Sequence, residues 1–313
     1  MITDTYSALL LINPNSRQGA AADIDTGIQK LHEAGITVET VLSNDPAQTE
    51  KEISARHKNI DFVIVGGGDG TISSTAQSLY RHQLPFAILP LGTANDLARS
   101  LGIPANLDEA FALILANNLR WIDLGAVNDH YFFNACHIGL GVSITHELTP
   151  ELKKKWGVLS YCRAFFSALA DSGEFVVELT VDDVRHRMRA LEITVGNGRY
   201  YGGGNIVDEK SSIDDGVLRL SCIYPKTVWE LLAISPLIRK GKQDKAERTF
   251  CISGRQIKVT TPVRMEVHAD GEPATRTPAH FKIIAKALQV FAPLDENDNK
   301  SLLEKLKKRV VGQ

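Results

Sequence analysis

The sequence contains no apolar run of about 18 residues or more, which excludes an ordinary membrane-spanning helix. Its first residues carry no basic segment of the kind that begins a signal peptide. The formal net charge is only −2, so no general attraction to nucleic acid is expected. Four cysteines lack the spacing of metal ligands, and we expect buried free thiols at Cys136, Cys162, Cys222 and Cys251. These absences favour a cytoplasmic protein, at most peripheral to a membrane, that binds no nucleic acid.

Internal repeats and low-complexity segments are missing as well. Hydrophobic residues make up 43% and charged residues 23% of the 313 residues, which is ordinary for a globular protein. The length is sufficient for two domains.

The first half of the chain alternates short apolar runs with helical patterns. We expect strands at residues 8–12, 37–42, 62–65 and 86–89, and helices at about 20–34, 46–58, 72–80 and 97–101. This alternation predicts a parallel α/β sheet whose loops gather at the carboxyl ends of the strands, where open α/β sheets bind ligands. Four such loops cover residues 13–19, 40–45, 66–71 and 91–96.

The loop after the third strand reads Gly-Gly-Gly-Asp-Gly-Thr over residues 66–71. Glycines at the start of a helix let backbone N–H groups approach an anion, whereas a plain strand-to-helix turn needs only one or two of them. The loop matches neither the dinucleotide fingerprint nor a Walker loop. Because a carboxylate beside phosphates requires a cation between them, Asp69 indicates a nucleoside triphosphate with Mg²⁺.

The loop after the fourth strand contains Thr93, Asn95 and Asp96. Either Asn95 or Asp96 alone is most simply a helix cap. Because both follow Gly92 and Thr93 on the same sheet edge as Asp69, we favour a role for Asp96 at the nucleotide.

The second half of the chain is rich in short strands. We expect them at residues 131–135, 175–181, 190–195, 217–224, 255–260, 263–268 and 281–285, with one long helix at about 150–170. Such spacing suggests an antiparallel sandwich or barrel as a second domain.

Three segments of this half have both a structural and a functional interpretation. Residues 211–217 contain an Asp-Gly turn that could also hold a cation. Residues 268–273 form a turn whose carboxylate could act as a general base. Residues 196–204 form a glycine-rich loop with two tyrosines that could line a substrate entrance or only connect strands.

Two amphipathic stretches follow. Residues 228–242 combine Trp229 and leucines with a basic run, which suits either core packing, slightly favoured, or docking on a membrane surface. A Lys-rich helix at residues 296–313 is expected to pack its apolar stripe on the protein.

Together these motifs resemble lipid kinases built on the diacylglycerol kinase catalytic domain, especially the compact bacterial type. The matching pieces are Asn-Pro-Asn-Ser at 13–16, the glycine motif at 66–71, Leu-Gly-Thr-Ala-Asn-Asp at 91–96, Gly-Asn-Gly at 196–198, Asp-Gly at 215–216 and Asp-Gly-Glu-Pro at 270–273. They occur in the family's order over nearly the whole chain. The glycine motif alone is shared with NAD kinases and phosphofructokinases.

The resemblance implies two domains with the nucleotide between them. Residues 1–124, joined by the helix at 296–313, would form the α/β nucleotide-binding domain, and residues 125–295 a β-sandwich-like domain for the lipid. Mg²⁺ and the phosphates would be organised by Asp69 and Asp96, and Glu272 would be the general base. The implied ATP contacts are Asn13, Ser16, Thr40, Gly66, Gly67, Gly68, Asp69, Gly70, Thr71, Ile72 and Thr93. A structural cation, Mg²⁺ or Ca²⁺, would be held by Asp215 and the main-chain carbonyls of Ser212 and Val217.

The implied reaction is transfer of the ATP γ-phosphoryl group to a lipid hydroxyl at a membrane surface. Diacylglycerol is the leading acceptor, with phosphatidylglycerol and sphingoid bases as alternatives. An NAD kinase-like enzyme and a regulatory module without catalysis are the competing interpretations. A homodimer is compatible with the sequence.

Overall fold

The computed structural model describes residues 6–16, 24–43, 45–140, 142 and 173–294. The chain divides into two compact units. Unit 1 contains residues 1–92, 101–122 and 288–313, and unit 2 contains residues 93–100 and 123–287. Strands β5 (Leu119–Val127) and β18 (Ala279–Phe291) each contribute residues to both units. The expected helices at 150–170 and 296–313 lie outside the described residues.

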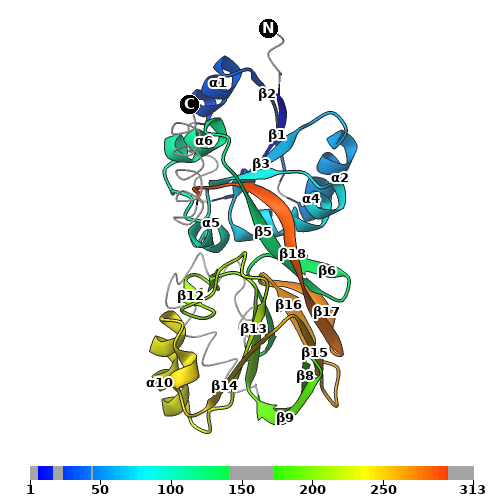
Figure 1. The fold of residues 1–313 in the computed structure, drawn as a ribbon, viewed down its shortest axis with the longest axis vertical. Coiled ribbons are helices and arrows are strands. Elements are labelled where there is room, and N and C mark those ends of the chain that lie inside the picture. Colours follow the sequence, from blue (N-terminus) through cyan, green and yellow to red (C-terminus); the bar gives the residue numbers. More distant parts are fainter. Residues whose placement is uncertain (1–5, 17–23, 44, 141, 143–172, 295–313) are drawn as a thin grey trace, which may run out of the picture. The chain divides into compact units, whose positions relative to one another are not determined.

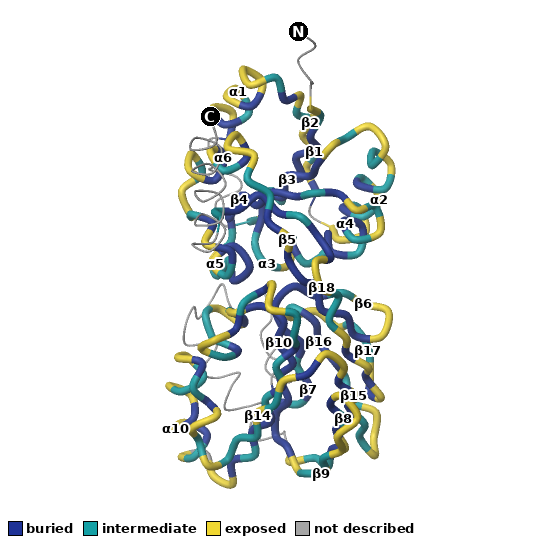
Figure 2. Tube along the Cα trace, viewed as in Figure 1, coloured by how far each residue is buried: buried dark blue, intermediate teal, exposed yellow. Residues whose placement is uncertain are grey.

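Unit 1 is built on a parallel sheet with the strand order β2-β1-β3-β4. The end of β18 adds to β4 in parallel, with Val290 opposite Phe86. The four strands are β1 (Tyr6–Ile12), β2 (Ile36–Leu42), β3 (Phe62–Gly67) and β4 (Phe86–Pro90). All residues of β3 and β4 are buried, as expected for central strands that are covered on both faces (Figure 2). The predicted parallel α/β sheet is confirmed.

Helices cover this sheet. Helix α1 contacts α6, and α2 contacts α4 (Figure 1). Their bounds are α1 (Asp25–Glu33), α2 (Pro46–Arg56), α4 (Ala76–His82) and α6 (Leu107–Leu115). Each presents buried aliphatic residues to the sheet, such as Leu31 in α1 and Ile53 in α2. Side-chain oxygens of Asp45 and Asn106 cap the first turns of α2 and α6.

The helix expected at 72–80 is interrupted. It consists of α3 (Asp69–Ser73) and α4, separated at Ser74 and Thr75. The Ser74 hydroxyl donates to the Thr71 carbonyl at 2.7 Å, and the Thr75 hydroxyl donates to the Ile72 carbonyl at 2.7 Å. These bonds compete with the helical ladder, which accounts for the break.

Unit 2 is mostly antiparallel. One sheet has the order β14-β13-β10-β7-β16-β17, and a second set of strands runs from the first part of β18 through β15 and β8 to β9. The strands are β7 (Ala135–Gly139), β8 (Phe175–Val181), β9 (Val184–Ala190), β10 (Glu192–Gly196), β13 (Leu218–Ile223), β14 (Thr249–Gly254), β15 (Gln256–Thr260), β16 (Glu266–Ala269) and β17 (Glu272–Arg276). Short strands β6 (His130–Phe132), β11 (Tyr200–Tyr201) and β12 (Asn205–Ile206) complete the unit.

The core of unit 2 lies between its two sheets. Buried side chains of one sheet, such as Ile193 and Leu220, belong to the same cluster as Leu179 and Phe281 of the other. A sandwich-like arrangement therefore forms, as the sequence predicts.

Several expectations need correction. The strand expected at 131–135 is two strands, β6 and β7, because the N–H groups of Phe133, Asn134 and Ala135 donate to the Asp270 carboxylate. The strand expected at 263–268 begins only at Glu266, after a bend at Pro262. Of the thiols, Cys136 and Cys222 are buried as expected, whereas Cys251 is exposed and Cys162 lies outside the described residues.

Helix α10 (Val228–Arg239) accounts for the amphipathic stretch with Trp229. It is followed by a short 3-10 helix at Gln243–Lys245. Nowhere in the described residues is there a helix of sufficient length and apolarity to cross a membrane.

Candidate functional site

The carboxyl ends of the parallel strands in unit 1 meet at one edge. The Asn13 N–H donates to the Gly66 carbonyl at 2.9 Å, and the Leu91 N–H donates to the Gly67 carbonyl at 3.0 Å. The Ser43 N–H donates to the Ile12 carbonyl at 2.8 Å. These bonds connect the residues that follow four neighbouring strands, so the loops expected to gather do so.

The glycine loop requires glycine because of close contacts. A Cβ on Gly67 would lie 2.5 Å from Cβ of Thr71, and one on Gly68 would lie 3.2 Å from Cα of Gly92. Gly68 has a φ of −93°, so the requirement there is space and not backbone freedom. A Cβ on Gly70 would meet nothing within 4 Å. Two turns of chain therefore approach more closely here than side chains would allow.

The predicted nucleotide contacts of unit 1 surround this loop. The Asn13 amide donates to the Thr71 hydroxyl at 3.0 Å, and the Asn13 carbonyl accepts from the Ser16 hydroxyl at 2.8 Å. Asp69 is half-buried at the first position of α3, and Ile72 is buried behind it. Thr40 is exposed on β2, opposite Leu10 of β1. The structure joins Asn13, Ser16 and Thr71 directly, while Thr40 lies within its strand.

Thr93 and Asp96 belong to unit 2. Asp96 begins α5 (Asp96–Ser100) and is buried, with its carboxylate accepting from the Gly203 N–H at 2.8 Å. Ser100 Oγ accepts from the Tyr200 N–H at 3.2 Å, and the Arg99 guanidinium lies 4.3 Å from the centre of the Tyr200 ring. Thr93 is exposed. These contacts connect helix α5 with the glycine-rich loop at residues 196–204.

That loop has a defined shape. Strands β11 and β12 pair through Tyr200 and Ile206, and Gly202, Gly203 and Gly204 between them all have positive φ. The preceding Asn197 is buried and donates to the carbonyls of Asp123 and Phe133 at 3.2 and 2.9 Å. The motif at 196–198 therefore has a structural role, because Asn197 links two other segments of unit 2 by hydrogen bonds.

The hairpin of β16 and β17 positions Glu272. Its two connecting residues, Asp270 and Gly271, have φ values of 48° and 92°, as in a type I′ turn. The Asp270 carboxylate accepts the N–H groups of Phe133 at 2.8 Å, Asn134 at 2.8 Å and Ala135 at 3.1 Å. Glu272 is the exposed first residue of β17. A carboxylate clamp of three hydrogen bonds thus fixes the turn that presents Glu272.

The Asp215 turn is also held by hydrogen bonds. Its carboxylate accepts from the N–H groups of Ser212 at 2.9 Å and Val217 at 3.2 Å, and from the Arg219 guanidinium at 2.6 Å. The nearby Asp123 accepts the N–H groups of Lys286 and Gly216 at 2.8 and 2.7 Å. Burial raises the pKa of the Asp123 carboxyl, these two N–H groups oppose that shift, and the charges of Asp214 and Asp215 raise the pKa further.

These residues fit a divalent cation in their chemistry. Carboxylate and main-chain carbonyl oxygens are hard ligands, and negative charge is concentrated at the turn. Arg219 at present neutralises Asp215, so a cation bound there would compete with that ion pair. Within the described ranges no three His, Cys, Asp or Glu side chains form a metal-binding group. A site here would therefore depend on main-chain carbonyls.

Sequence reasoning missed two residues that shape these sites. Asp270 and Asp123 each bind backbone N–H groups more than 90 positions away, Asp270 at separations of 135–137 and Asp123 at 93 and 163. The local pattern at Asp270 indicates only a turn, and that at Asp123 indicates no defined element. Long-range partners of this kind leave no signal in the spacing of residues.

Comparison with known proteins places the chain. The diacylglycerol kinase catalytic domain matches residues 7–127, and the YegS C-terminal NAD kinase beta sandwich-like domain matches residues 137–292. "Probable lipid kinase YegS" of Salmonella newport is 32% identical over 92% of this chain and 97% of its own length. "Probable lipid kinase YegS-like" of Yersinia enterocolitica is 29% identical over 89% and 95%.

A solved structure agrees with these relatives. A diacylglycerol kinase of Bacillus anthracis is 26% identical, with a TM-score of 0.75 over 93% of this chain and 98% of that one. The chain therefore belongs to the family of YegS-like lipid kinases, in which a diacylglycerol kinase catalytic domain is joined to a β-sandwich-like domain, and it is a lipid kinase.

Proposed function

We propose that this lipid kinase transfers the γ-phosphoryl group of ATP to the hydroxyl of diacylglycerol, producing phosphatidic acid. The observation that carries the proposal is the glycine loop, where a Cβ on Gly67 would lie 2.5 Å from Thr71 Cβ and one on Gly68 would lie 3.2 Å from Gly92 Cα. Such a loop at the carboxyl edge of a parallel sheet suits the phosphates of a nucleotide. The family supplies the lipid as the acceptor class.

The chain's own residues contribute mainly by positioning. Backbone N–H groups of the glycine loop would bind the phosphates, and Asn13 would hold Thr71 in place through its 3.0 Å hydrogen bond. Thr93 and Thr40 would contact the nucleotide. In phosphoryl transfer, alignment and charge neutralisation supply most of the acceleration.

Glu272 would accept the proton of the lipid hydroxyl as the hydroxyl oxygen attacks the γ-phosphorus and the bond to ADP breaks. Its exposure leaves the carboxylate accessible to an acceptor. Asp69 and Asp96 would hold the catalytic Mg²⁺, which when bound neutralises the phosphate charge. Asp215, with the carbonyls of Ser212 and Val217, would hold a structural cation in unit 2.

The variant Gly67→Ala should lower the affinity for ATP and leave the fold of unit 2 unchanged. The new Cβ would lie 2.5 Å from Thr71 Cβ, so Thr71 has to move and the Asn13–Thr71 bond is lost. We expect ATP affinity to fall about ten-fold or more, which corresponds to ~1.4 kcal/mol. Calorimetric titration with ATP measures this. Gly173→Ala is the control, because its Cβ meets nothing within 4 Å and it lies outside the glycine loop, and equal affinities of the two variants would contradict the role of close approach.

The acceptor is tested directly. Purified protein is supplied with Mg²⁺ and labelled ATP, and either detergent-dispersed diacylglycerol or NAD is offered. Labelled phosphatidic acid supports the proposal, whereas labelled NADP would support the NAD kinase-like alternative. A total lipid extract offered in parallel reveals any other acceptor, such as phosphatidylglycerol or a sphingoid base.

Cation binding at the Asp215 turn should appear in thermal stability. A ligand at about 100 times its dissociation constant stabilises the folded state by ~2.7 kcal/mol. We therefore expect Mg²⁺ or Ca²⁺ to raise the Tm above its value in EDTA, and Asp215→Asn to remove that increase. Asp183→Asn, a change in another exposed turn, should keep it. An increase that survives Asp215→Asn would contradict the site.

A further inference from the structure

Helix α10 is apolar on two faces. Its inner face packs Leu231 and Ile234, with exposed fractions of 5% and 3%, against Leu140, Leu191 and Ile223. On the outer face Trp229 is 80% exposed and Leu232 is 41% exposed. Ala233 and Pro236 are exposed as well. The spacing of residues 229, 232, 233 and 236 puts them on one side of the helix, so core packing explains only half of its apolar residues.

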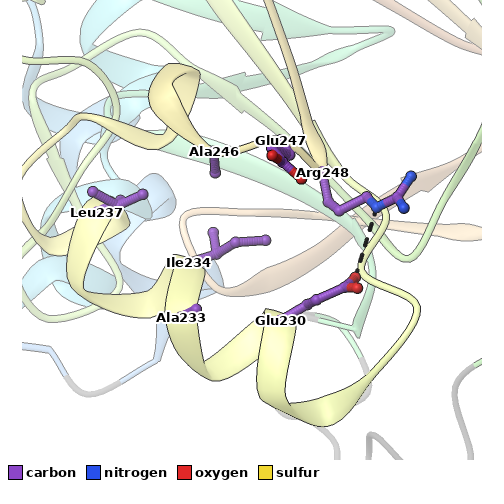
Figure 3. Close-up of a pocket in the computed structure, with 7 residues that line it drawn as sticks. All are labelled: Glu230, Ala233, Ile234, Leu237, Ala246, Glu247 and Arg248. Atoms are coloured by element: carbon purple, nitrogen blue, oxygen red, sulfur yellow. Dashed lines mark ion pairs between the residues drawn. The ribbon is translucent and has the colours of Figure 1, made fainter.

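A pocket next to the helix shares one residue, Ala233, with the outer apolar face (Figure 3). This pocket has a volume of about 240 Å³. Its other apolar walls are Ile234, Leu237 and Ala246. The charged residues Glu230 and Arg248 also line it and form an ion pair at 3.7 Å. Apolar residues that gather on the surface beside charged ones can mark an interaction site.

The segment that contains this helix is basic, although Lys242 pairs with Glu209 at 3.4 Å and Arg248 with Glu230 at 3.7 Å. Between positions 226 and 248 the chain has six basic residues, Lys226, Arg239, Lys240, Lys242, Lys245 and Arg248, against three acidic ones, Glu230, Asp244 and Glu247. The segment therefore carries a formal charge of +3, whereas the whole chain carries −2. Tryptophan and leucine beside lysine and arginine match the interface of an anionic bilayer, where the apolar groups enter the acyl boundary and the cations meet the headgroups.

We propose that the outer face of α10, comprising Trp229, Leu232, Ala233 and Pro236, docks this protein on an anionic lipid bilayer. The inference rests on the proposed function, because a diacylglycerol acceptor lies in a membrane. It adds a binding surface distinct from the residues of the phosphoryl transfer. The helix lies along the bilayer surface and does not cross it, since α10 has 12 residues.

Vesicle sedimentation tests the docking without any catalytic step. Wild-type protein should bind vesicles of phosphatidylcholine mixed with phosphatidylglycerol more tightly than vesicles of phosphatidylcholine alone. The double variant Trp229→Ala with Leu232→Ser should lower the affinity for the mixed vesicles about ten-fold or more. Lys240→Gln should lower it about five-fold. Trp121→Ala is the matched control, since Trp121 is 45% exposed on β5, and it should leave the affinity unchanged.

Tryptophan fluorescence tests whether Trp229 itself contacts the lipid. The chain has three tryptophans, at 121, 156 and 229, so a variant with Trp121→Phe and Trp156→Phe reports only Trp229. Its emission should shift to the blue on mixed vesicles and be quenched by brominated acyl chains. The double variant should keep the wild-type Tm and its rate on a water-soluble short-chain diacylglycerol, because the replaced side chains are exposed.

Two results would overturn the docking surface. One is an affinity of the double variant for mixed vesicles equal to that of the wild type, together with a Trp229 emission that neither shifts nor is quenched when vesicles are added. The other is a dimer in lipid-free solution that Trp229→Ala dissociates, which would assign the face to a second copy of the chain. If instead the wild type binds vesicles through Trp229 but phosphorylates no lipid in them, the docking holds and the proposed function fails.

Discussion

Glutamine at position 272 is expected to lower kcat about 100-fold or more while leaving the fold and ATP affinity unchanged. The amide keeps the size and the hydrogen-bonding reach of the carboxylate but has no basicity toward a hydroxyl. The residue is exposed at the start of β17, so the substitution removes no buried contact of the described structure. Steady-state rates with diacylglycerol, together with ATP titration and a melting curve, measure the three quantities.

The control for this variant lies on the same hairpin. Glu266 on β16 forms an ion pair with Arg276 at 2.7 Å, and both side chains are partly exposed. Glu266→Gln removes the charge of this surface pair, worth about 1 kcal/mol or less, and of a 3.9 Å contact with the His268 imidazole, and it should keep the wild-type rate. A Glu272→Gln enzyme that turns over at the rate of the Glu266→Gln enzyme would show that another group, or none, accepts the proton.

The parallel sheet of unit 1 could be predicted because its strands are short apolar runs buried on both faces. Residues 62–65 have this pattern, and the glycines after them mark the carboxyl end of β3. The same reasoning failed where a polar strand lies on the surface. Strand β9, with Arg185, Arg187 and Arg189 on its exposed side, is not among the strands expected from the sequence. Strand β5 was missed because its apolar residues begin next to the exposed Trp121.

The site residues follow the same division. The residue types of the glycine loop indicate a phosphate site, and the resemblance to the family gives Glu272 its proposed role, whereas nothing in the sequence assigns Asp270 more than a place in a turn. Its partners are the N–H groups of Phe133, Asn134 and Ala135. No periodicity relates two segments so far apart in the chain. Only the folded structure reveals that a carboxylate of the Asp-Gly-Glu-Pro motif holds two segments of unit 2 together.

Alanine at position 270 is consequently expected to destabilise unit 2 by ~3 kcal/mol or more. The change leaves three backbone N–H groups without their charged acceptor, and each such hydrogen bond contributes about 1.5–3 kcal/mol, less where water replaces it. Asp270→Asn keeps one carbonyl oxygen and a residue type that accepts positive φ, so its loss should be smaller, about 1–2 kcal/mol. Urea unfolding followed by circular dichroism measures both.

The variant Asp183→Ala is the control that distinguishes the loss of the three Asp270 hydrogen bonds from the cost of placing alanine at a positive φ. Asp183 has a φ of 74° in the tight turn between β8 and β9, and its carboxylate makes no hydrogen bond to another described residue. Alanine at this position should lower the free energy of unfolding by about 1 kcal/mol, which is the cost of a positive φ alone. If Asp270→Ala costs no more than this control, the three hydrogen bonds contribute nothing net. If it costs the larger amount, its kcat should also fall, because the hydrogen bonds that hold Asp270 also fix the turn that presents Glu272.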